Sequence, residues 1–235
     1  EASTAMNICV IPARGGSKRI PRKNIKEFNG KPIIAYSIEA ALKSNCFSQV
    51  IVSTDDDEIS EVAKKYGALV PFVRPDELSN DYAGTIPVIK HAIEWMEDNN
   101  NYIENVCCLY ATAPFIQSKI ISKAYQQLKD SNSDYCFSVT SFAFPIQRAI
   151  KIVQGNKVDM LYPEHFNTRS QDLEEAYHDA GQFYWGKARA FKDESPLFSE
   201  VATPYVLPRY LVQDIDTMED WIRAEAMYKV LQETE

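Results

Sequence analysis

Apolar residues along this chain form short β-branched runs that alternate with segments of helical spacing. The runs predict strands at 8–11, 49–53, 69–73, 105–109 and 135–141. The spacing predicts helices at 33–42, 58–66 and 118–128, and another that begins near Thr85. Regular alternation of strands and helices is typical of an α/β fold. We therefore predict a doubly wound, mostly parallel sheet with helices on both faces.

The alternation fails between residues 142 and 180. Aromatic and β-branched residues are mixed there around Gly155-Asn156, which is a hairpin signal. We expect an inserted β-rich arm that mediates oligomer contacts, although a β-extension packed on the same domain fits the pattern equally. Strands at 182–185 and 201–207 and a helix at 218–232 follow. We read one domain over 6–235, and we take patternless residues 1–5 as an added remnant.

Composition narrows the class of protein. The chain has 235 residues, of which 45% are hydrophobic, so it can bury a sizeable core. A net charge of -8 argues against a protein that coats nucleic acid or anionic membrane. The five cysteines show neither C-x-x-C nor Cys/His metal spacing, which favours reduced core residues of a cytoplasmic protein.

A basic loop follows the first strand. Gly15 and Gly16 allow backbone N–H groups to turn toward an anion. Its five cations are Arg14, Lys18, Arg19, Arg22 and Lys23. The loop lacks the Gly-Lys-Ser/Thr and G-x-G-x-x-G patterns, so it predicts polyphosphate binding of another lineage. Arg14 and Lys23 are the best phosphate candidates. Lys18, Arg19 and Arg22 could be solvated, and an ordinary exposed basic loop remains the alternative.

Asp214 and Asp216 are two residues apart, so an extended backbone projects both side chains from one side. Two carboxylates suit Mg²⁺, which completes its coordination with water and phosphate oxygens. Thr217 could instead cap the following helix, with Asp220 in its first turn. Capping is the commoner role for such residues taken alone. A polyphosphate loop on the same chain favours the metal.

The predicted topology would gather these groups. The basic loop, the Thr54-Asp55 step and 110–112 all follow strands, and ligands of parallel sheets bind beyond the carboxyl ends of strands. The three histidines show no spacing typical of a nucleophile and its base. His91 is expected at the surface or in packing, and His178, just before a strand, is a candidate by position.

Five ordered blocks of sequence resemble one family. Residues 11–24 read Ile-Pro-Ala-Arg-Gly-Gly-Ser-Lys-Arg-Ile-Pro-Arg-Lys-Asn, close to the signature of the CMP-sialic acid synthetases, or acylneuraminate cytidylyltransferases. The other blocks are 51–55, 74–78, 169–173 and 214–217. The resemblance implies Mg²⁺-dependent transfer of CMP from CTP to the anomeric hydroxyl of a nine-carbon α-keto acid sugar, with release of pyrophosphate.

The resemblance also implies roles by matching position. Nucleotide contacts would come from Ala13, Arg14, Gly15, Ser17, Lys18, Lys23, Asn24, Arg74, Ala83 and Thr85. The catalytic set would be Arg14, Lys23, Asp214 and Asp216, the two aspartates holding the metal. Sugar contacts are expected from Tyr110, Thr112, Arg169, Gln171, His178 and Gln182.

Departures from the sialic acid pattern bear on the sugar. Tyr110 stands where an amide is usual, Ile116 replaces an arginine, and His178-Asp179-Ala180 replaces Arg-Pro-Asn. These changes look like the branch that acts on pseudaminic acid, a deoxygenated nonulosonate with two N-acyl groups and a terminal methyl. Less polar contacts fit a less hydroxylated ligand. Sialic acid, legionaminic acid or Kdo are alternative sugars, and a catalytically dead nucleotide-binding protein is the non-enzyme alternative. The expected assembly is a homodimer.

Overall fold

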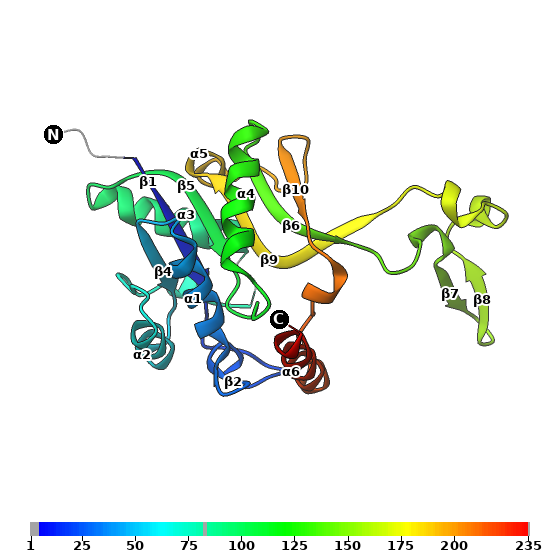
Figure 1. Ribbon diagram of the computed structural model, residues 1–235, viewed down its shortest axis with the longest axis horizontal. Coiled ribbons are helices and arrows are strands. Elements are labelled where there is room, and N and C mark those ends of the chain that lie inside the picture. Colours follow the sequence, from blue (N-terminus) through cyan, green and yellow to red (C-terminus); the bar gives the residue numbers. More distant parts are fainter. Residues whose placement is uncertain (1–4, 82–83, 235) are drawn as a thin grey trace.

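A six-stranded sheet forms the centre of the computed structural model, which describes residues 5–81 and 84–234 (Figure 1). Its order is β10-β6-β9-β5-β1-β4. The strands are β1 (Ala5–Pro12), β4 (Gln49–Ser53), β5 (Tyr102–Leu109), β6 (Tyr135–Ser141), β9 (Tyr177–Lys187) and β10 (Ala202–Val206). β1 pairs in parallel with β4 and β5, and β6 with β10, whereas β9 runs antiparallel between β5 and β6. Ala5, grouped above with the remnant, pairs with Tyr102.

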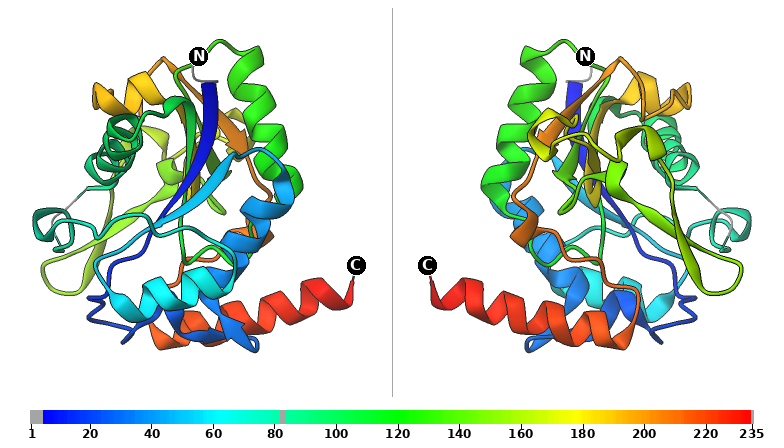
Figure 2. Two further views of the ribbon diagram at one scale, coloured as in Figure 1. Left: turned by 90° about the vertical axis from the view of Figure 1, so that its left-hand side faces the viewer. Right: turned by 90° about the vertical axis from the view of Figure 1, so that its right-hand side faces the viewer.

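Helices cover both faces of this sheet (Figure 2). The apolar sides of α1 (Ile33–Ser44), α2 (Asp57–Lys65) and α4 (Ser118–Asp130) pack in one core cluster. Those of α3 (Thr85–Asp98) and α5 (Ala188–Lys192) pack in a second cluster on the opposite face. The predicted doubly wound, mostly parallel α/β fold is confirmed. No helix in residues 5–81 and 84–234 is long and apolar enough to span a membrane.

Local chemistry sets the ends of the helices. The Asp56 side chain accepts the Ile59 N–H to cap α2, and Gly67 follows that helix with φ 102°, a left-handed conformation that glycine tolerates. α6 (Met218–Glu233) begins with a capping box in which Thr217 and Asp220 bond each other's backbone N–H groups.

A third apolar cluster joins α6 to the start of the chain. Phe28, Ile33 and Trp221 are buried in it, and the Trp221 ring N–H donates to the Glu27 carbonyl at 3.2 Å. Glu27 lies in the small hairpin of β2 (Glu27–Phe28) and β3 (Lys31–Pro32). This packing brings the segment before α6 against the basic loop.

Residues 142–176 leave the sheet as an arm that projects far from the body (Figure 1). Its tip is an antiparallel hairpin of β7 (Ile150–Val153) and β8 (Lys157–Met160), and Gly155 has φ 77° in the turn. Ile152 on β7 is 77% exposed. The inserted β-rich arm of the predicted fold is confirmed, and the alternative of an extension packed on the domain is not what forms.

The predicted strand at 69–73 is wrong. Leu69 makes one isolated bridge to Ile51, and the next residues run beside β4 without a continuous ladder. Pro71 has no N–H to donate, which explains why pairing stops there.

Candidate active site

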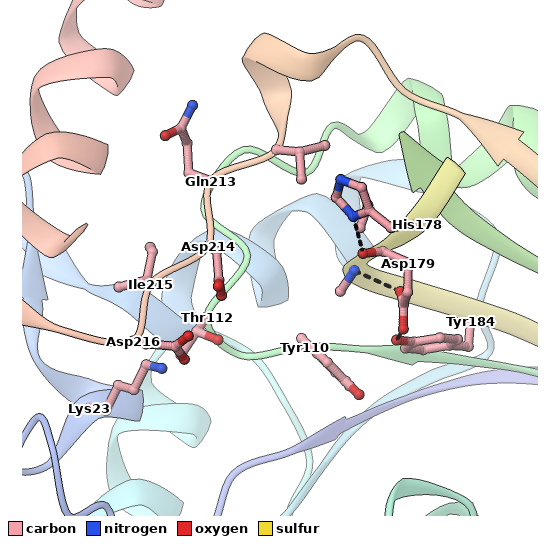
Figure 3. Close-up of a pocket in the computed structure, with 13 residues that line it drawn as sticks. Lys23, Tyr110, Thr112, His178, Asp179, Tyr184, Gln213, Asp214, Ile215 and Asp216 are labelled. Carbon is pink, nitrogen blue, oxygen red and sulfur yellow. Dashed lines mark hydrogen bonds between the residues drawn. The ribbon is translucent and has the colours of Figure 1, made fainter. Parts of the chain in front are cut away.

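A cavity of about 430 Å³ opens beyond the carboxyl ends of β1 and β5 (Figure 3). We call it the main cavity. Tyr110 and Thr112 reach it from the end of β5, and Lys23 from the basic loop. The beginning of β9 supplies residues 178–181 and Tyr184, because this antiparallel strand starts where its neighbours end. The segment 212–216 forms the remaining wall.

A second cavity, of about 270 Å³, lies along the basic loop and is called the loop cavity here. Arg14, Ser17, Lys18 and Arg19 line it, together with Asp81. Lys23 and Asp216 line both cavities, so the two cavities adjoin at these side chains. An anionic ligand in the loop cavity would therefore meet a second ligand in the main cavity at Lys23 and Asp216.

Backbone contacts hold the basic loop in shape. The Gly15 N–H donates to Asp55 Oδ1 at 3.0 Å, and the Asn24 amide donates to the Arg14 carbonyl at 2.9 Å. The buried Ala13 donates its N–H to the Ser53 carbonyl at 2.9 Å. A Cβ at Gly15 would lie 2.7 Å from Asp56 Oδ2, so the loop needs glycine there. Ala13 and Gly15 thus hold the loop to residues 53–55, and Asn24 links the two ends of the loop.

Arg22 is ion-paired and not merely solvated, while its side chain stays 39% exposed. Its guanidinium donates to both Asp56 oxygens, at 2.8 and 2.7 Å, and to Glu58 at 3.0 Å. Its φ is 55°, a conformation unusual for a side-chain-bearing residue. The hydrogen bond from Arg22 lowers the pKa of Asp56 to about 2. Arg22 therefore fastens the loop to α2 and leaves the other cations to a ligand.

Asp81 was not anticipated from the sequence. Its carboxylate lies 2.6 Å from Arg14 Nη1 and 2.8 Å from Lys18 Nζ. The hydrogen bond from Lys18 lowers the pKa of Asp81. Two loop cations thus already hold an anionic oxygen pair, the arrangement that a phosphate group would take. A carboxylate within a loop gives no periodic signal, which is why the sequence did not reveal it.

Asp214 and Asp216 both line the main cavity (Figure 3). Burial, and then the neighbouring Asp216, raise the pKa of Asp214, whereas Lys23 lowers it. No cluster of three or more Asp, Glu, His or Cys side chains suited to a metal occurs within 5–81 and 84–234. Two crowded carboxylates without a third fit Mg²⁺, which takes one or two carboxylates plus water and phosphate. Thr217 caps α6 at the same time, so capping and metal binding do not compete.

Three more residues were expected to contact the nucleotide: Arg74, Ala83 and Thr85. Arg74 is buried, and its donors bond the Ser53 carbonyl and hydroxyl and the Leu78 carbonyl. Burial lowers the pKa of Arg74. The Thr85 hydroxyl, at the start of α3, lies 3.2 Å from the Tyr110 hydroxyl. Ala83 lies outside the described residues.

The structure separates the sugar candidates into two groups. Tyr110, Thr112 and His178 line the main cavity. Gln182 does not, because its buried amide donates to the Leu211 carbonyl at 2.7 Å. Arg169 and Gln171 lie in the arm, where Arg169 pairs with Asp172 at 3.1 Å. These three residues are not among those that line the cavity within this chain.

Asp179 and Tyr184 are cavity residues that the sequence reasoning did not select. Asp179 accepts the Gly181 N–H at 2.8 Å and the Tyr184 hydroxyl (Figure 3). Burial, and then Tyr110 and Asp179, raise the pKa of Tyr184. The sequence position of Asp179 could have pointed to it, because it adjoins His178 where the chain departs from the sialic acid pattern.

Comparison with solved structures shows which proteins share this α/β fold. A solved CMP-2-keto-3-deoxy-manno-octonic acid synthetase complexed with CTP shares the fold, with a TM-score of 0.71 at 18% identity over 96% of this chain and 99% of that one. The family model described as cytidylyltransferase matches residues 8–232. The chain belongs to the cytidylyltransferase family, which confirms the resemblance found in the sequence.

Two curated relatives illustrate its neighbourhood within the family. A pseudaminic acid cytidylyltransferase of Campylobacter jejuni is 50% identical over 97% of this chain and 98% of its own length. A CMP-N,N'-diacetyllegionaminic acid synthase of Legionella pneumophila is 34% identical over 96% of this chain and 97% of its own length.

Proposed function

We propose that this chain transfers CMP from CTP to the anomeric hydroxyl of pseudaminic acid and releases pyrophosphate. The sharing of Lys23 and Asp216 between the two cavities carries the proposal, because it supplies adjoining places for a triphosphate and an acceptor. The C. jejuni relative, at 50% identity over nearly the whole chain, favours this sugar over other nonulosonates. The free cysteines suit a reducing compartment, so we place the reaction in the cytoplasm.

The chain's own residues have distinct tasks in this reaction. Arg14 and Lys18 would exchange the Asp81 carboxylate for phosphate oxygens, and Lys23 would face the junction of nucleotide and sugar. Asp214 and Asp216 would hold Mg²⁺, which when bound neutralises charge on the departing pyrophosphate. The sugar hydroxyl attacks the α-phosphorus in line with the leaving group, so both cavities must hold their ligands together.

A homodimer is part of the proposal. The exposed apolar side chains of the arm, including Ile152 and Phe166, would pack against a second copy. Arg169 and Gln171, which lie away from the main cavity of their own chain, would then be free to reach the partner's sugar. This arrangement accounts for family-matched sugar residues on an arm.

The test is pyrophosphate release from CTP and Mg²⁺ with a panel of pseudaminic, legionaminic, sialic and Kdo acids. We expect turnover to be fastest with pseudaminic acid and to stop when EDTA removes the metal. Asp216→Asn should lower turnover by about 100-fold or more, since an electrostatic contact to the developing charge is lost. Its circular dichroism and melting temperature should stay near wild type.

Asp130→Asn is the matched control, because Asp130 lies at the exposed end of α4. Near-normal pyrophosphate release by Asp216→Asn would reject the metal assignment. Absence of turnover with every sugar, in protein that still binds CTP, would instead favour the dead nucleotide-binding protein.

A further inference from the structure

Asp179 lines the main cavity and also a third one. That neighbour, called the apolar cavity here, has a volume of about 270 Å³. His178 and Asp179 line both. Its other walls are mostly hydrophobic: Phe137, Val139, Leu197, Phe198, Ala202 and Pro204, with Tyr177 and Ser199. A ligand that spans the two cavities must pass Asp179.

The Asp179 carboxylate is held in a fixed orientation. Oδ1 accepts the Gly181 N–H at 2.8 Å, in a turn where Gly181 has φ 65°. Oδ2 accepts the Tyr184 hydroxyl, and the raised pKa of Tyr184 keeps that donor protonated. A carboxylate can accept about four hydrogen bonds, so it retains acceptor capacity for a ligand. No ion pair of Asp179 occurs in the part of the chain that the structure describes.

Charge gives the main cavity two unlike ends. Lys23 is the one Lys or Arg among its described lining residues, and it lies beside Asp214 and Asp216, while Asp179 stands at the opposite side (Figure 3). The two carboxylates outnumber Lys23, so this end attracts an anion once they hold the Mg²⁺ of the proposed function. A sugar acid cannot place its own carboxylate against Asp179 without repulsion. Its acid and anomeric end would therefore face Lys23 and the Mg²⁺ that Asp214 and Asp216 would hold. A group that donates hydrogen bonds must face Asp179.

We propose that Asp179 is a specificity-determining residue that accepts the N–H of an acylamino group of the sugar, while the alkyl part of that acyl group enters the apolar cavity. The inference rests on the proposed function, which supplies an acidic sugar with two acylamino groups. A hydroxyl could also donate to Asp179, but it would leave the apolar cavity unfilled. The hydrogen bond to Asp179 and the apolar contact together favour an acylamino substituent over a hydroxyl.

The test pairs a protein variant with altered substrates. Asp179→Ala should raise the KM for the diacylated sugar by on the order of tenfold or more, because the buried N–H loses its acceptor, and leave the KM for CTP unchanged. Two further substrates each carry hydrogen in place of one acylamino group. With one of them, wild type and Asp179→Ala should have the same KM, since the group that Asp179 contacts is already gone.

Three comparisons make the result decisive. Asp179→Asn keeps one acceptor oxygen and should fall between wild type and Asp179→Ala, which separates the lost contact from misfolding. Asp130→Asn, at the exposed last residue of α4, should match wild type. Phe198→Ala should raise the sugar KM several-fold through the apolar cavity alone.

An unchanged sugar KM in Asp179→Ala, or equal losses with all three substrates, would overturn the inference while the proposed function stands. If wild-type protein releases no pyrophosphate with the diacylated sugar, the proposed function fails and the inference falls with it.

Discussion

The five cations of the basic loop divide into two kinds at the scale of single residues. Arg22 is committed to Asp56 and Glu58, whereas the other four line the loop cavity: Arg14, Lys18, Arg19 and Lys23. Glycine at position 15 permits the division, because any Cβ there would displace the Asp56 carboxylate. Arg22 therefore fixes the shape of the loop, and the other cations of the loop face the loop cavity.

The ion pair between Arg22 and Asp56 should make the free energy of unfolding depend on pH. The pKa of Asp56 is lowered from 3.8 to about 2 in the folded protein, so its stabilisation is present above pH 3.8 and is lost as pH falls through about 2. At pH 5 the free energy of unfolding of wild type should exceed that of Asp56→Asn by about 1 kcal/mol. This figure allows for solvent screening, because Arg22 is partly exposed. Asparagine still caps α2, which isolates the charge.

Urea unfolding of both proteins between pH 5 and 2 measures this difference. The gap should close at the acid end. A gap that stays constant over this range would show that Asp56 contributes through its shape and not its charge.

At the scale of elements, β9 organises the site. It alone runs antiparallel in the central sheet, and its beginning carries His178 and Asp179 to the edge where β1 and β5 end. Its far end is closely packed. A Cβ at Gly186 would lie 2.6 Å from Tyr135 Cδ1 and 2.7 Å from Phe191 Cε2. The beginning of β9 thus lines the candidate site, whereas its end is part of the packed core.

Gly186→Ala should separate those two ends. We expect a loss of about 1 to 3 kcal/mol in the free energy of unfolding, because two buried rings must move. The KM values for CTP and sugar should change little in the folded fraction. Chemical denaturation and initial rates at low temperature would check this. A large change in sugar KM without loss of stability would contradict it.

For the whole molecule, the arm is the feature that a single chain leaves unexplained. It exposes Ile152 and Phe166 and carries Arg169 away from the main cavity. Large exposed apolar surfaces mark interaction sites, which is why we propose a second copy as the partner.

Ile152→Asp with Phe166→Asp should convert the proposed dimer into a monomer in analytical ultracentrifugation, because each buried charge would lack a partner. Turnover should fall with it if the arm serves the partner's site. Val230→Asp, at an exposed position of α6, is the control and should remain dimeric. Wild-type protein that sediments as a monomer at micromolar concentration would reject the dimer.

Local patterns in the sequence determined most of the fold and pointed to several of the charged residues that line the cavities, but not to Asp81 or Asp179. Periodicity predicted most strands and helices of the central sheet layer. Helix ends at Asp56, Gly67 and Thr217 also depend only on neighbours within a few residues. The failure at 69–73 has the same origin, because a β-branched run was given more weight than the missing N–H of Pro71.

Only the tertiary structure decided which charges meet. The pairing of Asp81 with Arg14, of Arg22 with Asp56, and of Asp216 with the loop joins residues that are 34 to nearly 200 positions apart. The tertiary structure also directs the Gln182 amide to the Leu211 carbonyl and not into the cavity. It places the Gly181 N–H and the Tyr184 hydroxyl where both donate to Asp179. Such contacts depend on antiparallel β9 and on α6 packing against Phe28, which no local sequence window contains.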